Sequence, residues 1–159
     1  MRRILAVVVV FSGLALAIWL LWPRGPEDDE ALIRGVIADV AAKASQKDIG
    51  GVGEHVSESY RGEGGSKQEL KRYLLGYTMR SDWVAVLPAK VEVDLAPEAK
   101  SAKVSMVVLL ARTPAEKAED LRADEVAGSH RIDAELAKED GDWRVTTARR
   151  RDAAVSDLF

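Results

Sequence analysis

The chain opens with a long apolar run and continues as a mixed polar sequence. The run from Ile4 to Trp22 contains 19 residues and no charged side chain. A helix of that length spans roughly 28 Å, close to the ~30 Å hydrocarbon core of a bilayer. Trp19 and Trp22 stand at its far end, where indole rings favour the headgroup level, and Pro23 interrupts the helix. We therefore predict a transmembrane helix at residues 4–22.

The charges on either side of this run predict its orientation. Arg2 and Arg3 precede it, whereas residues 27–30 are all acidic. Because the positively charged flank stays in the cytoplasm, residues 1–3 form a cytoplasmic tip and the rest of the chain is exported. This organisation predicts a single-pass protein of the bacterial inner membrane with a periplasmic C-terminal domain, joined to the membrane by a linker at residues 23–29.

Two other interpretations of the run stay open. Ala15, Leu16 and Ala17 match the small-x-small pattern of a signal-peptide cleavage site. The apolar run continues five residues beyond that site, however, and signal peptides usually have apolar regions of only ~7–15 residues. A buried core helix is the third possibility. The chain has no Cys, so it has neither a lipoprotein attachment site nor disulfides.

Apolar residues after the linker recur first at helical spacing. A stripe between Leu32 and Ala44 predicts a helix that begins near Asp28, and residues 48–56 predict a short second helix. Ser66 and Glu69 form a capping-box pattern, which predicts a third helix that ends near residue 80.

The spacing then changes to the alternation of strands. Strands are predicted at residues 91–95, 104–110, 125–138 and 143–149, and the second is too apolar to have a wet face, which places it centrally. Residues 113–124 predict a long loop, and Asp140-Gly141 predicts a hairpin turn. Helices followed by strands indicate an α+β domain over residues 30–150, with three helices packed on a curved antiparallel sheet of about four strands and a tail at 151–159.

The domain resembles the nuclear transport factor 2-like superfamily. The points of similarity are the amphipathic first helix, the HVSESYRG turn at 55–62, the capped third helix and the closing EDGDWRVTTA at 139–148. The resemblance implies a cone-shaped α+β fold with a pocket between the sheet and the helices. It also implies that Tyr60, Tyr77 and Trp83 bind a ligand there, with His130 and Asp133 within reach of the same pocket.

The net charge of the exported part limits the kinds of molecule that it is expected to bind. All 26 acidic residues but only 20 of the 23 basic ones follow residue 26, so the exported part has a net charge of −6. A net acidic domain argues against nucleic acid, because phosphate binding requires a basic surface. The partners expected from the sequence are the inner membrane, through residues 4–22, and an envelope protein or a small apolar ligand.

No pattern in the chain indicates a catalytic residue, a metal site or a cofactor. His55 and His130 are the only histidines, and a metal site requires three or four close ligands. Ser129 and His130 are adjacent in a predicted strand, so they face opposite ways and cannot act as a nucleophile–base pair. Asp133 points away from Ile132, and we expect it to face solvent, with an ordinary carboxylate pKa.

Two classes of function follow. The first, which we favour, is a non-catalytic module that binds a protein or ligand in the cell envelope; its organisation is similar to that of inner-membrane components of type IV secretion assemblies. The second is a small-molecule isomerase or hydrolase of the ketosteroid-isomerase type, which would use the cone pocket. We expect Trp143 to be a core anchor and the three arginines at 149–151 to be a solvated strand end rather than a recognition patch.

Overall fold

A single antiparallel sheet with strand order β1-β2-β3-β4 is the centre of the fold. Its strands are β1 (Ala85–Leu95), β2 (Ser101–Ala111), β3 (Val126–Glu139) and β4 (Asp142–Asp152). The computed structural model describes the chain from residue 26 to residue 153, so the predicted membrane helix at 4–22 and most of the predicted tail lie outside it. The predicted four-strand meander is confirmed, with the apolar strand β2 in the interior of the sheet.

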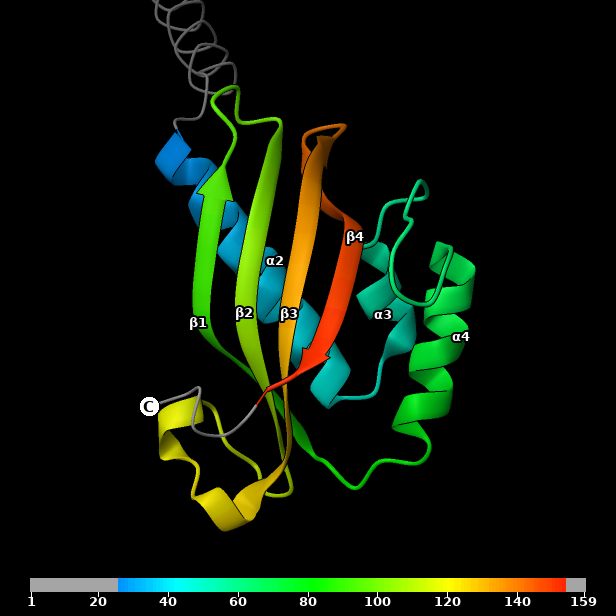
Figure 1. Cartoon of the computed structure of the whole chain (residues 1–159), viewed down its shortest axis with the longest axis vertical. Helices are drawn as coiled ribbons and strands as arrows, with labels where there is room; N and C mark the ends of the chain where they lie inside the picture. The colour runs from blue at the N-terminus through cyan, green and yellow to red at the C-terminus, as the bar shows by residue number, and fades with distance from the viewer. Residues whose placement is uncertain (1–25, 154–159) are drawn as a thin grey trace, which may run out of the picture.

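Three helices accompany the sheet: α2 (Pro26–Ser45), α3 (Ile49–Glu54) and α4 (Lys67–Thr78). Helix α2 passes behind the strands in Figure 1, and α3 and α4 lie beside β4. Ser66 caps α4 through the predicted capping box with Glu69. Among the described residues, none of the helices is both long and apolar enough to cross a membrane.

The main core lies between α2 and the sheet. Ile33 and Ile37 of α2 pack in one cluster with apolar side chains of β2, β3 and β4. Trp143 belongs to this cluster and is 3% exposed, as expected for a core anchor. Burial of these side chains, rather than helix propensity, holds α2 across the sheet.

The first helix begins earlier than the sequence predicts. Pro26 is its first residue, so α2 includes part of the predicted linker at 23–29. Proline suits the first helical position, where its missing N–H has no helical partner. Asp29 is consequently not a solvated linker residue: its buried carboxylate accepts hydrogen bonds from Trp143 Nε1 at 3.0 Å and Lys138 Nζ at 2.6 Å.

Strand β1 is six residues longer at its start than the predicted strand at 91–95. A bulge between Ala89 and Glu92 shifts the alternation. Leu87 therefore packs on one face of the sheet, whereas Val91 and Val93 pack against the α2 cluster on the other. The shift interrupts the alternation of apolar and polar residues, so the first half of the strand could not be predicted from that pattern.

A second, smaller core lies on the face of the sheet opposite α2. Leu87, Val107 and Leu109 form it, and the connection between β2 and β3 covers it with Ala115, Ala118 and Leu121. The predicted loop at 113–124 contains two short 3₁₀ helices, η1 (Ala118–Asp120) and η2 (Ala123–Glu125). This connection packs over only one end of the face (Figure 1).

The hairpin between β3 and β4 confirms the predicted turn. Asp140 and Gly141 have φ angles of 52° and 93°. Strand β4 continues to Asp152, beyond the predicted end at 149. Its outer edge is covered by the segment after α3, because the backbone N–H groups of Arg61 and Glu63 donate to Thr146 and Ala148 of β4.

Candidate functional site

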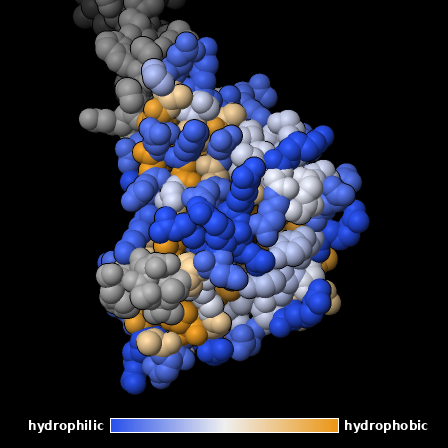
Figure 2. Space-filling model, viewed as in Figure 1, coloured by the Kyte–Doolittle hydropathy of each residue, from blue (hydrophilic) through white to orange (hydrophobic). Residues whose placement is uncertain are grey.

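The face of the sheet opposite α2 has a polar part, which no other described element covers and which we call the open face. It is formed by alternate residues of all four strands, and Figure 2 shows hydrophilic side chains over it. Its members are Glu92 and Asp94 on β1, Lys103 and Ser105 on β2, Arg131, Asp133 and Glu135 on β3, and Thr147, Arg149 and Arg151 on β4.

Strand register arranges these side chains in rows. Glu92 pairs with Ser105, Ser105 with Asp133, and Asp133 with Arg149. A parallel row joins Asp94, Lys103, Glu135 and Thr147 in the same order of strands. The side of the open face at β1 is therefore acidic, and the side at β4 is basic. The loop at 61–65 borders the basic side of the groove over this face.

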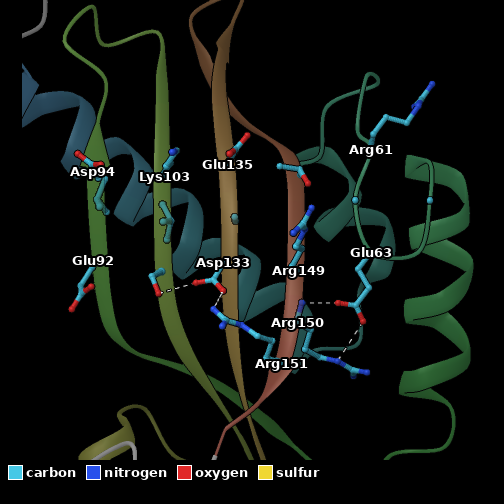
Figure 3. Close-up of a pocket in the computed structure, with 17 residues that line it drawn as sticks. Arg61, Glu63, Glu92, Asp94, Lys103, Asp133, Glu135, Arg149, Arg150 and Arg151 are labelled. Atoms are coloured by element: carbon cyan, nitrogen blue, oxygen red, sulfur yellow. Dashed lines mark hydrogen bonds and ion pairs between the residues drawn. The ribbon is translucent and has the colours of Figure 1, made fainter.

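Asp133 is held by an arginine on the neighbouring strand. Its carboxylate accepts a hydrogen bond from Ser105 Oγ at 3.1 Å and forms an ion pair with Arg151. Figure 3 shows Arg151 reaching from β4 toward Asp133 on β3. The side chain of Asp133 is 38% exposed, on the opposite face of the strand from the core residue Ala134. Asp133 thus faces solvent, as predicted.

The pKa of Asp133 differs from the expected ordinary value. The hydrogen bond from Arg151 is the main cause that lowers this pKa, and the hydrogen bond from Ser105 lowers it further. A carboxylic acid with a lowered pKa is ionised at neutral pH, so Asp133 is a poor proton donor.

The three consecutive arginines do not share one surface. Arg149 and Arg151 lie on the open face, whereas Arg150 points to the other side of β4, as strand alternation requires. The backbone N–H of Arg150 donates to Glu63 Oε2 at 2.6 Å, and its Nε lies 3.7 Å from Glu63 Oε1 (Figure 3). The guanidinium group also lies over the rings of Tyr73 and Tyr77, at 5.8 and 5.7 Å from their centroids.

The three predicted ligand-binding residues each contact different side chains or backbone groups. Tyr60 is fully buried, its hydroxyl donates to the Glu63 carbonyl at 3.0 Å, and burial raises its pKa. Trp83 is 4% exposed, and Lys47 Nζ lies 5.3 Å from its ring centroid. Tyr77 stacks on Tyr73. Among the described residues, Asp133 forms no hydrogen bond with Tyr60 or Tyr77.

Tyr77 and His130 form the contact that most resembles acid–base chemistry. The Tyr77 hydroxyl lies 3.5 Å from His130 Nε2, at the limit of a hydrogen bond. His130 Nδ1 is buried without a hydrogen-bond partner among the described residues, and Asp152 Oδ1 lies 3.4 Å away. Burial chiefly lowers the pKa of His130, and the nearby Arg150 charge lowers it further. The sequence predicts Arg150 only as part of a solvated strand end, because its contact with the tyrosines of α4 depends on tertiary packing.

The other histidine belongs to a surface ion-pair cluster. His55 Nε2 lies 2.6 Å from Asp39 Oδ2, and Lys43 Nζ lies 3.8 Å from the same carboxylate. Within residues 26–153, no three His, Asp or Glu side chains are grouped closely enough to hold a metal ion.

No protein-family model and no curated protein sequence matches this chain. Solved structures do match it. An NTF2-like protein with a cystatin-like fold from Novosphingobium aromaticivorans shares 15% identity, with a TM-score of 0.61 over 91% of this chain and 92% of that one. A protein of unknown function from Mycobacterium tuberculosis shares 21% identity, with a TM-score of 0.58 over 84% of this chain and 80% of that one.

A third similar structure, also from Novosphingobium aromaticivorans, is provisionally named a scytalone dehydratase. It shares 14% identity, with a TM-score of 0.59 over 79% of this chain and 84% of that one. At these identities the similarity establishes the fold alone. The described domain has the cystatin-like α+β fold of NTF2-like proteins.

Proposed function

We propose that this chain is a membrane-anchored domain of the bacterial cell envelope that binds a protein partner and has no catalytic role. The observation that carries the proposal is the open face, where rows of charged side chains cross four strands and no other element within residues 26–153 covers them (Figure 3). A broad charged surface suits a macromolecular partner, whereas small apolar ligands bind in concave, mainly apolar sites.

The anchor proposal rests on residues 4–22. Because α2 begins at Pro26, few residues separate the apolar run from the folded domain. A short separation would hold the domain at the membrane surface. A reporter enzyme that is active only outside the cytoplasm, fused after Phe159, tests the orientation: we expect activity, and an inactive reporter of normal abundance would contradict a periplasmic domain.

Site-specific photo-crosslinking in cells tests the binding proposal. A photoreactive amino acid at Thr147, in the open face, should crosslink the full-length chain to a discrete protein. The matched control is the same amino acid at Arg72, an exposed position of α4. Equal crosslinking from both positions, or none from either at normal abundance, would contradict a role for the open face.

A specific contact favours a second candidate, an isomerase or hydrolase. Tyr77 and the partly buried His130 have the residue types of a general acid and a general base. Under this alternative, Tyr77→Phe should abolish cellular function while leaving thermal stability unchanged. Under the binding proposal, Tyr77→Phe retains function and Arg149→Ala impairs it, so the two variants separate the candidates.

A further inference from the structure

The open face has more positive charge on its β3–β4 side than its own acids neutralise. Register places Arg131 opposite Arg151, and Arg149 opposite Asp133. This side of the open face therefore has three arginines against the two carboxylates of Asp133 and Glu135, and Asp133 forms its ion pair with Arg151. Among the described residues, neither Arg131 nor Arg149 has an ion pair within 4.0 Å. We call Arg131, Asp133, Arg149 and Arg151 the arginine cluster.

The spacing of this cluster matches an extended chain. Arg149 and Arg151 are two residues apart in one strand, so their attachment points are separated by about 7 Å. Carboxylates at alternate positions of an extended peptide have the same separation. The Arg149 side chain is exposed and Arg151 is 65% exposed, so both guanidinium groups are accessible from solvent. Guanidinium groups bind carboxylates through paired, charge-assisted hydrogen bonds.

The other side of the open face restricts what can bind there. Glu92 and Asp94 on β1 lie three strands away from β4, roughly 14 Å across the sheet. Glu135 lies between them and β4. An extended polyanion such as a nucleic acid or a flat anionic membrane would meet these carboxylates as well as the arginines. A short acidic segment that runs along β4 avoids Glu92 and Asp94.

We infer that the arginine cluster is a docking site for a short, extended acidic segment of a partner protein, with carboxylates at alternate positions. This inference rests on the proposed binding function and names the chemistry of the partner. Asp133 occupies the centre of the cluster as an internal anion. It competes with the partner's carboxylates for Arg151, which keeps the affinity modest and makes it sensitive to salt.

Fluorescence anisotropy with defined peptides tests this inference. The probe is a labelled peptide in which Glu and Ser alternate, and the reference peptide has Gln in place of each Glu. The protein is the full-length chain in an uncharged detergent at low salt. We expect the Glu probe to bind about tenfold more tightly than the Gln reference, and added salt should abolish the difference.

Single substitutions locate the site. Arg149→Ala and Arg151→Ala should each weaken binding of the Glu probe about fivefold, as loss of one ion pair predicts. The matched control Arg72→Ala, on α4, should leave binding unchanged. Asp133→Asn should strengthen binding about fivefold, because it releases Arg151. A general loss of folding cannot produce that gain.

Three results would overturn the inference. The first is equal binding of the Glu and Gln peptides, and the second is equal loss in Arg149→Ala and Arg72→Ala. The third is tighter binding of duplex DNA or of anionic phosphatidylglycerol vesicles than of the Glu probe. Crosslinking from Thr147 in cells distinguishes failure of this inference from failure of the proposed binding function. If a partner is captured but the Glu probe does not bind, the binding function stands and the acidic-segment inference fails.

Discussion

The two faces of the sheet differ in how far they bury their carboxylates. On the α2 face, the buried Asp29 accepts hydrogen bonds from Trp143 and Lys138. On the open face, Asp133 is partly exposed, and its partner Arg151 is mainly in solvent. A buried polar group that loses its partner pays the full cost of desolvation, whereas an exposed one exchanges its partner for water. We therefore expect the contacts of Asp29 to contribute more to stability than the exposed ion pair of Asp133.

The largest effect is expected from removing the Trp143 side chain. Trp143→Ala should lower the free energy of unfolding by about 3–5 kcal/mol, because it empties a large volume in the core and leaves Asp29 without one donor. Urea denaturation followed by circular dichroism measures this loss. Trp143→Phe, which retains a ring but no N–H group, should lose less. A loss below about 1 kcal/mol for Trp143→Ala would mean that the side chain is not a core anchor.

A matched pair of substitutions compares the faces directly. Ala134→Asn and Asp133→Asn introduce the same side chain at neighbouring positions of β3. Ala134 is 8% exposed in the α2 cluster, so Asn there buries an amide and should cost about 1–3 kcal/mol. Asp133→Asn removes one exposed ion pair and should cost less than about 1 kcal/mol. Equal losses in urea denaturation would contradict the distinction between the faces.

The smallest effect concerns pH and His130, on the α2 side of the sheet. The folded state has a lowered His130 pKa, and the unfolded chain has the ordinary value of about 6.5. Between these pKa values the unfolded state binds more protons. The free energy of unfolding should therefore decrease as pH falls through this window, and His130 should contribute no further decrease below it.

Urea denaturation at a series of pH values measures the His130 effect. His130→Gln should flatten the pH dependence across this window, and His55→Gln is the control for loss of a histidine. Asp133 contributes in a lower window: its lowered pKa gives stability above the ordinary value of about 3.9, which is lost as pH falls through the folded pKa. An unchanged pH dependence in His130→Gln would contradict the effect of burial on this group.

The order of helices and strands could be predicted from local patterns in the sequence. Helical spacing, the Ser66–Glu69 capping box and the Asp140-Gly141 turn are local signals, and the structure confirms the capped helix and the turn. The starts of α2 and β1 differ from the prediction. Alternation along β3 also placed Asp133 on the face away from Ala134, because side chains of a strand point to opposite sides in turn. The predicted membrane helix at 4–22 and the partner identity stay predictions.

The contacts between charged side chains of different strands could not be predicted from the sequence, because they depend on strand register and packing. The bulge at Ala89–Glu92 reverses which face of the sheet the residues of the second half of β1 point to, and strand register places Arg149 opposite Asp133 and Arg151 opposite Arg131. The pairing of Tyr77 with His130 and the burial of Asp29 also join residues far apart in sequence. Local patterns predict which face of its own helix or strand a side chain lies on. They do not predict which residue of another element that side chain contacts, because this depends on register and packing between elements.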